Sequence, residues 1–395
     1  MSLTTLPAEL LLLIASSLPA QDIAVLRNTH PRLAKSLELA LFDSLQRSTS
    51  QHLCRRGIYV AARRGDKSLL IRLYSQGILG KIGPVLLCQA IKELSLTDPT
   101  HAADIIATLI SSGISPNAVN PIGAYMGTPL TLAIQQGNLA IVKVLLSRDD
   151  LEINSDARPG SAVRDAIRLD ATEAEPSGVL ETLVKDHRTN TNVSEWTTGR
   201  SLLHYAIQTR SPRAVRVLLA NSKTDVNAPA SLTGTTPLMF AILEGALSPN
   251  GIPPRAKMAR EAVLRGEARE EDFAGIEEME GNEGWVFLSK PMCEIVELLL
   301  ADRRIEVNAR DVAGQTALHM AAGRGQGKVV EMLLRRGGVD LGIGNGRREE
   351  TALEVARRVG PVGSKIVEML ERVRDGVVDC IYVGGGGATS MTVAR

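Results

Sequence analysis

Residues 314–340 read GQTALHMAAGRGQGKVVEMLLRRGGVD and predict two short helices joined by a turn. Thr316 can cap the first helix through its hydroxyl, and that helix is expected to end near Gly323. The second helix begins near Lys328, and four of its apolar residues fall on one face: Val329, Val330, Leu333 and Leu334. Each helix is shorter than the ~12–15 residues at which an isolated helix becomes marginally stable in water. The pair is therefore expected to be stable only when copies of it stack.

Copies of this unit recur along the chain. Each is marked by an aliphatic pair that another apolar pair follows one turn later: Leu69/Leu70, Ile105/Ile106, Ile141/Val142, Val179/Leu180, Ala214/Val215, Ile295/Val296 and Val329/Val330. Successive pairs are roughly 35 residues apart, except for one gap of about twice that length, which is a period typical of helical repeat proteins. Asparagine recurs after the second helix and is expected in a turn: Asn154, Asn192, Asn227 and Asn308.

The pattern resembles the ankyrin repeat, whose T-P-L-H-x-A motif precedes two antiparallel helices. The starts of three copies carry it: Gly127-Thr-Pro-Leu, Gly234-Thr-Thr-Pro-Leu and Gly314-Gln-Thr-Ala-Leu-His. The resemblance implies an all-α ankyrin-repeat solenoid of stacked helix pairs, with about eight repeats over residues 55–376. A charged insertion at about 245–290 interrupts the repeat that opens at Gly234, and residues 377–395 are expected to form a flexible tail.

Composition narrows the function classes. Aromatic residues make up only 3% of the 395 residues, and the net charge of +1 predicts no general attraction to nucleic acid or to a membrane surface. The apolar run near the N-terminus is shorter than the ~20 residues of a membrane span, and no basic residue of a signal peptide precedes it. The four cysteines have no C-x-x-C spacing, which favours a reduced cytoplasmic or nuclear protein.

Residues 1–50 predict three helices, the first beginning near Pro7, the second capped by Asp22 and the third following His30-Pro31. Their order of residues resembles the F-box pattern L-P-x-E-L, Ile, Leu and D-L-x-x-L. That resemblance implies docking on a Skp-type adaptor of a cullin ubiquitin ligase. The adaptor-binding residues would be Leu6, Pro7, Leu10, Ile14, Leu18, Ile23 and Leu26. Three helices of this size cannot bury all of these apolar residues, so some remain for a partner. The alternative is that the N-terminal helices only cap the repeat array.

No pattern in the chain predicts catalysis. The glycine-rich stretch Gly323–Lys328 lacks the spacing of a phosphate-binding loop and falls on a turn between helices. His204 and His319 occupy the histidine of the repeat motif, where a hydrogen bond to a neighbouring backbone is the expected role. No cluster of cysteine, histidine and carboxylate residues has metal-ligand spacing. We expect no enzyme activity, no metal and no cofactor.

Function is therefore expected at surfaces that bind another protein. In ankyrin arrays the inner helices and the hairpin tips face the ligand, and the repeat alignment places several residues there. The candidate substrate-binding residues are Leu132, Tyr205, Phe240 and Met320 at one helical position, Gln208 and Arg324 beside it, and Tyr125 and Trp196 at hairpin tips. Ordinary packing of the inner helices is the alternative. The sequence thus predicts the substrate-recognition subunit of a Skp/cullin/F-box-type ligase, or else a non-enzymatic ankyrin scaffold.

Overall fold

The computed structural model describes residues 3–27, 29–37, 40–41, 44, 51–75, 86–97, 100–118, 127–154, 161–172, 177–245, 289–346, 348–359 and 363–376. The charged insertion, apart from its ends, and the tail at 377–395 lie outside these residues. The chain divides into two compact units: unit 1 comprises residues 1–195 with 220–224, and unit 2 comprises residues 196–219 with 225–395.

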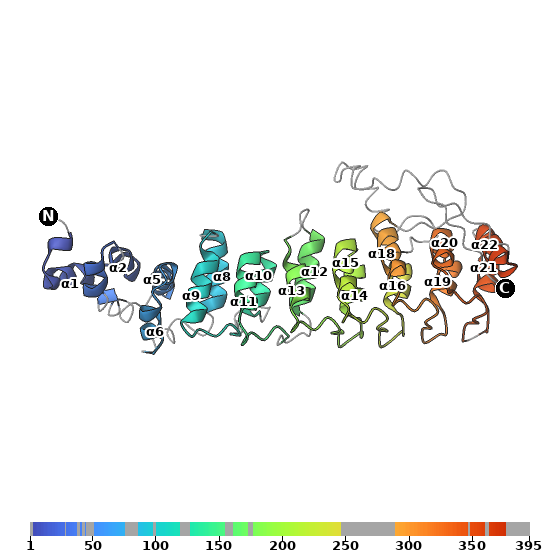
Figure 1. Cartoon of the computed structure of the whole chain (residues 1–395), viewed down its shortest axis with the longest axis horizontal. Helices are drawn as coiled ribbons and strands as arrows, with labels where there is room; N and C mark the ends of the chain where they lie inside the picture. The colour runs from blue at the N-terminus through green and yellow to red at the C-terminus, as the bar shows by residue number, and fades with distance from the viewer. Residues whose placement is uncertain are drawn as a thin grey trace. The chain divides into compact units, whose positions relative to one another are not determined.

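Unit 1 begins with a 3-10 helix and three short α-helices: Leu3–Thr5, α1 (Ala8–Ser16), α2 (Ala20–Arg27) and α3 (Pro31–Ser36). Four helix pairs follow (Figure 1): α5 (Gln51–Arg63) with α6 (Lys67–Ser75), α8 (Leu86–Thr97) with α9 (Ala102–Ser111), α10 (Pro129–Gln135) with α11 (Leu139–Leu146), and α12 (Ser161–Thr172) with α13 (Val179–Lys185). Inner helices α8, α10 and α12 pack in succession, and so do outer helices α9, α11 and α13.

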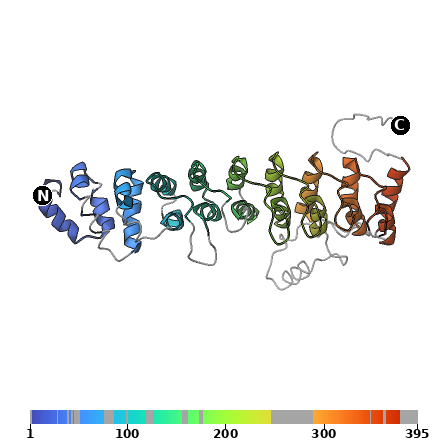
Figure 2. The ribbon, with the colours of Figure 1, turned by 90° about the horizontal axis from the view of Figure 1, so that it is seen from below.

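Unit 2 contains four further pairs (Figure 2): α14 (Leu202–Gln208) with α15 (Pro212–Ala220), α16 (Pro237–Gly245) with α18 (Lys290–Ala301), α19 (Ala317–Gly323) with α20 (Gly327–Arg336), and α21 (Ala352–Arg358) with α22 (Ser364–Arg374). Helix α18 packs against α16, so the helix after the insertion completes the repeat that opened before it, as the sequence predicted. Gly344 and Thr351 form an isolated antiparallel bridge in the turn before α21.

Inner helices begin at capping threonines, as predicted for Thr316. Thr316 accepts a hydrogen bond from the backbone N–H of His319, and Thr128 accepts one from Thr131. At Thr351 the cap is reciprocal, since Glu354 accepts a bond of 2.7 Å from the Thr351 N–H. These side chains satisfy backbone donors that have no partner within the helix. These caps help to stabilise inner helices of only seven residues.

The recurrent asparagines join neighbouring repeats. Asn154 donates to the carbonyl of Arg188 at 2.9 Å, and Asn192 donates to that of Lys223 at 2.8 Å. In unit 2, the side chains of Asn227 and Asn308 make the same type of bond to the following repeat. The sequence predicted residues of a turn, and the structure shows in addition that each amide crosses to the next turn. Stacking is thus fixed by polar bonds as well as by buried aliphatic side chains.

The three predicted N-terminal helices are present, and the first and third begin where predicted, but the start of the second differs. Asp22 lies in the first turn of α2, which begins at Ala20, so the expectation that Asp22 caps this helix is wrong. Pro19 supplies the first carbonyl of the turn, because Asp22 donates its N–H to it at 3.0 Å. Helix α2 packs against both α3 and α5, which joins the N-terminal helices to the first repeat. No helix in the described ranges is long and apolar enough to cross a membrane.

Candidate protein-binding surfaces

Helix α1 carries an apolar stripe that is open to solvent. Leu10, Leu13 and Ile14 are 46%, 68% and 39% exposed, and their spacing of three and four residues places them on one side of the helix. Leu11 and Ala15, on an adjacent side of the helix, are buried, whereas Leu12 is 38% exposed. We call the three exposed residues the α1 stripe. Exposed aliphatic residues that adjoin one another mark a contact surface more reliably than scattered ones.

The other predicted adaptor-binding residues differ in their exposure. Pro7 is exposed, whereas Leu6, Leu18 and Leu26 are half-buried. Ile23 is completely buried. The motif predicted that Ile23 contacts the adaptor. That prediction is wrong for this structure, because α2 packs against α3 and α5.

A second apolar surface lies at the hairpin tips of unit 2. Trp196, Leu232 and Val312 are 85%, 70% and 75% exposed, and we call them the tip row. Leu232 and Val312 each lie four residues before the threonine that caps an inner helix, and Trp196 lies five residues before the equivalent Ser201. The Val312 N–H donates to the carbonyl of Thr233 at 3.1 Å, which holds two of the tips together.

Glycines bring these hairpins into contact. Gly199, Gly234 and Gly314 occupy one repeat position, and their φ angles are +66°, +66° and +73°. A Cβ on Gly234 would lie 3.0 Å from the backbone nitrogen of Val312, and one on Gly314 would overlap the backbone of Gly346. A side chain at this position would therefore disfavour the backbone conformation and also separate adjacent hairpins.

The inner helices expose fewer of the predicted candidates than the sequence suggested. Leu132, Phe240 and Met320 are only 9%, 4% and 6% exposed, so the expectation that they face a ligand is wrong. Packing of each inner helix on its neighbours in the stack accounts for their burial. Phe240, for example, lies edge-on to His204 with ring centroids 5.3 Å apart.

Four of the predicted candidates remain. Tyr205 is half-buried, Gln208 and Arg324 are exposed, and Trp196 belongs to the tip row. Tyr125 lies outside the described residues. Leu232 and Val312 were missed by the sequence reasoning, although their shared distance from the capping threonine was a signal that could have identified them.

His204 and His319 link successive repeats, which confirms their predicted structural role. The backbone N–H of Ser201 donates to Nδ1 of His204 at 3.2 Å, so the proton of the neutral ring is on Nε2. Nε2 lies 3.0 Å from the carbonyl of Thr235 and donates to it. His319 makes the equivalent bonds to Thr316 and Glu350. Among the described residues, no group of three His, Cys, Asp or Glu residues could hold a metal ion.

The burial of His204 predicts that unit 2 loses stability in mild acid. Burial, with a smaller contribution from the positive charge of Arg200, lowers the pKa of His204 to about 4, although the bond to Thr235 opposes this. The unfolded chain, with a histidine pKa of about 6.5, therefore binds more protons between pH 6.5 and 4, and stability falls as the pH drops through this window. Relative to His204→Gln, the wild type should lose up to roughly 3 kcal/mol of unfolding free energy. Urea unfolding at pH 7 and pH 4.5 measures this, and parallel pH profiles would contradict it.

The stacked helix pairs and the exposed apolar surfaces define a helical repeat protein that contacts other proteins. Family models match three segments: an ankyrin repeat over residues 127–156, ankyrin repeats in three copies over 169–248, and ankyrin repeats in many copies over 286–334. The chain therefore contains ankyrin repeats, which are protein–protein interaction modules. These matches do not include the N-terminal helices.

Among solved structures, the chain is similar to the ankyrin repeat domain of Bcl-3, which is described as a unique member of the IkappaB protein family. The sequences are 19% identical, the match covers 77% of this chain and 96% of that one, and the TM-score is 0.36. No curated protein sequence matches the chain.

Proposed function

We propose that this protein is the substrate-recognition subunit of a Skp/cullin/F-box-type ubiquitin ligase, without chemistry of its own. The α1 stripe binds the Skp-type adaptor, which connects the chain to the cullin ligase core, and the ankyrin array binds a protein substrate. The observation that carries the proposal is the exposure of Leu10, Leu13 and Ile14 on a helix that buries only Leu11 and Ala15. The F-box-like order of residues in the same segment supports it.

The physical basis of adaptor binding is burial of the stripe. A fully buried leucine or isoleucine side chain contributes about 1.5–3 kcal/mol relative to an exposed one. Three such residues supply several kcal/mol before the cost of association is subtracted, which is sufficient for a specific contact when the partner offers a complementary groove. Helix α1 packs against α3, α3 packs against α2, and α2 packs against α5 of the first repeat. These contacts fix the position of α1 on the N-terminal segment.

Substrate binding is assigned to the tip row and to the exposed residues Gln208 and Arg324 at the C-terminal ends of inner helices. Trp196 is the anchor in this proposal, because large aromatic side chains dominate the energetics of protein interfaces. Leu232 and Val312 extend the apolar surface, and Gln208 and Arg324 supply polar contacts.

The adaptor assignment predicts the effect of introducing charge into the stripe. Leu10→Asp with Leu13→Asp should weaken binding to a purified Skp-type adaptor more than about tenfold, because a buried unpaired carboxylate opposes association. Thermal stability should change little, since both side chains are already exposed. Leu96→Asp is the matched control, because Leu96 is 86% exposed on α8 and lies outside the segment. Calorimetric titration measures the affinity, and equal affinity in all three proteins would refute the assignment.

A second candidate function is a scaffold whose N-terminal helices only cap the array. The observation that favours it is the ion pair between Arg27 of α2 and Asp66, in the turn between α5 and α6. This pair joins the N-terminal segment to the first repeat, as a cap would require. Under this alternative the wild-type chain does not bind the adaptor in the same titration, so the two functions are distinguished directly.

A further inference from the structure

Three arginines in the hairpins and inner helices of unit 2 have no carboxylate partner among the described residues. Arg200 and Arg310 belong to the hairpins before α14 and α19, and Arg324 is the C-cap of α19. A guanidinium group offers five N–H donors in a fixed plane, which match a carboxylate. A positive charge that is not neutralised within the protein can therefore bind a carboxylate from outside.

Arginines on the outer helices provide a contrast. Arg216 of α15 pairs with Glu294 of α18 at 2.8 Å, and Arg372 pairs with Glu368 of the same helix at 3.5 Å. Exposed ion pairs of this kind contribute little to stability, but they neutralise the charge that a partner would meet.

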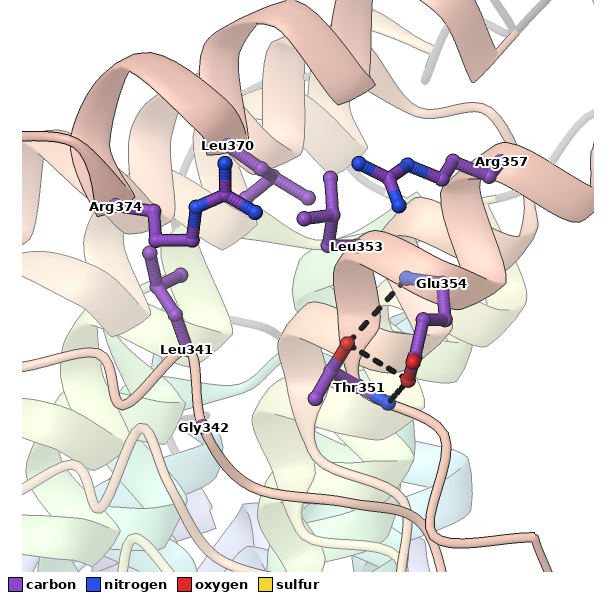
Figure 3. A pocket seen from close by; sticks show the side chains of 8 residues that line it. All are labelled: Leu341, Gly342, Thr351, Leu353, Glu354, Arg357, Leu370 and Arg374. Carbon is purple, nitrogen blue, oxygen red and sulfur yellow. Dashed lines mark hydrogen bonds between the residues drawn. The ribbon is translucent and has the colours of Figure 1, made fainter.

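The hollow of the last repeat, with a volume of about 310 Å³, is neutralised in the same way (Figure 3). Its two arginines, Arg357 and Arg374, pair with Glu371 and Asp375 at 2.6 Å and 2.9 Å. Glu354 also lines it. The charge that could attract an anionic partner therefore lies in the hairpins and not in this hollow.

Arg200 is ordered by an aromatic ring. Its guanidinium carbon lies 4.6 Å from the ring centroid of Phe240, which is within the range of a cation–π contact. This contact restricts the side chain without neutralising its charge. Less conformational entropy is then lost when a carboxylate binds.

Arg310 is ordered by backbone carbonyls. Its Nε donates to the carbonyl of Gly314 at 3.2 Å, and its Nη2 donates to that of Gly344 at 2.6 Å. Residues 309–315 of this hairpin contain one acidic residue, Asp311. Its carboxylate accepts two backbone N–H bonds within the turn, at 2.9 Å and 2.7 Å, and forms no ion pair with Arg310.

The tip row lies in the same hairpins as these arginines. Trp196 precedes Arg200 by four residues, and Val312 follows Arg310 by two. The hairpin of Leu232 leads into α16, which packs against both α14 and α19, and its residues 228–235 read APASLTGT without a charge. The surface thus combines exposed apolar side chains with two positive charges.

The separation of the two arginines indicates the length of a partner. Axes of packed helices are ~8–10 Å apart, so two steps from α14 through α16 to α19 place the hairpins about 16–20 Å apart. About five or six extended residues span this distance at ~3.3 Å each.

Arg324 adds a third charge at the other end of α19. Loss of hydration around its guanidinium group lowers the pKa of Arg324, and no described carboxylate opposes this effect. Glu244 occupies the equivalent position of the neighbouring helix α16 and is exposed, but it does not pair with Arg324.

We propose that the hairpin side of unit 2 binds an acidic peptide segment of the substrate protein, with apolar side chains on the tip row and carboxylates on Arg200 and Arg310. The two carboxylates lie about five or six residues apart in an extended segment. This inference rests on the assignment of substrate binding to the tip row in the proposed function, and it adds the chemistry of the substrate.

Selection of random peptides, about ten residues long, on the full-length chain tests the proposal. The selected peptides should be enriched in Asp and Glu together with aromatic and aliphatic residues. In fluorescence anisotropy, a selected peptide should bind Arg200→Gln with Arg310→Gln at least about tenfold more weakly than the wild type, because charge-assisted hydrogen bonds are lost. Arg216→Gln with Arg372→Gln is the matched control, since it removes the same two charges from outer helices and should bind like the wild type.

Substitutions in the peptide make the test independent of the folding of the variants. Asn and Gln in place of Asp and Glu should weaken binding to the wild type at least about tenfold and change binding to the double arginine variant little. Equal affinity of the acidic and amide peptides would overturn the proposal. So would the absence of any selected peptide that Trp196→Ser weakens, or tighter arginine-dependent binding of a single-stranded oligonucleotide.

The adaptor is absent from these measurements, so the two proposals fail separately. Selective binding of acidic peptides by a chain that does not bind the adaptor would retain the substrate surface and reject the ligase role. Adaptor binding without selectivity for acidic peptides would reject only the substrate chemistry inferred here.

Discussion

Asp66→Ala is expected to lower the unfolding free energy of the N-terminal part of unit 1 by about 3–5 kcal/mol, which is the usual effect of removing one partner from a buried ion pair. The side chain of Arg27 is only 6% exposed and would lose its carboxylate. Asp66 also accepts bonds from the Leu69 N–H, at 3.1 Å, and from the Ser68 hydroxyl, at 2.9 Å. The substitution therefore removes both an ion pair and the cap of α6.

The protonation of Asp66 gives this prediction a pH dependence. Burial opposes ionisation of Asp66, but the Leu69 N–H, the Ser68 hydroxyl and the Arg27 guanidinium together hold its pKa below its usual range. A carboxyl whose pKa is lowered in the folded state contributes stability above the unfolded pKa of about 3.9, and that stability is lost as the pH falls through the folded value. The difference between wild type and Asp66→Ala should therefore shrink below about pH 4.

Hydrogen exchange of peptides from α2, α5 and α6 measures the effect locally. In an Arg27→Met background, Asp66→Ala should cost only about 1 kcal/mol, which is the typical value of a helix cap. Asp150→Ala is the matched control, because the Arg148–Asp150 pair is 45% and 53% exposed and should contribute little. Equal losses for Asp66→Ala and Asp150→Ala would show that the buried pair does not hold α2 on the first repeat.

Gly314→Ala is expected to destabilise unit 2 by up to about 5 kcal/mol. A residue with a side chain at a left-handed φ costs about 1–2 kcal/mol, and overpacking adds about 1–3 kcal/mol. Both terms apply at Gly314, whose φ is +73° and whose added Cβ would overlap the Gly346 backbone. The two hairpins are too close to accommodate a side chain between them, so the substitution would push the hairpin of Gly314 away from the next one.

Gly338→Ala separates the two contributions. Gly338 has the same φ of +73°, but a Cβ there would meet nothing within 4 Å. It should therefore show only the backbone cost, about 1–2 kcal/mol. Urea unfolding of the two variants gives the comparison. A loss at Gly314 no larger than that at Gly338 would mean that close approach of the hairpins contributes nothing to stability.

The periodic part of the fold could be predicted because its causes are local. Capping threonines, short apolar faces and turn asparagines each act within a few residues, so Thr316 and the helix pair after it were found from one stretch of sequence. Even the interrupted repeat was predictable, because the two halves of its pattern survive on either side of the insertion. The motif matches to ankyrin repeats agree with this reading.

The candidate surfaces were predicted less well, and the failures have one cause. Phe240 and Met320 share a repeat position with half-buried Tyr205, yet both are buried by the inner helices on either side. Ile23 fits a motif, but α5 covers it. Conversely, Leu232 and Val312 are ordinary apolar residues in the sequence, and their exposure at hairpin tips depends on how the turns stack.

The repeated pattern in the sequence was sufficient to predict stacked helix pairs, because helices too short to be stable alone require neighbours of the same kind to pack against. Which side chains those neighbours leave exposed was a matter of three-dimensional packing. Exposure depends on the elements that lie above and below each residue, and these are distant in the chain. For this reason the exposure of Leu13 in the α1 stripe and of Leu232 and Val312 in the tip row emerged only from the folded protein.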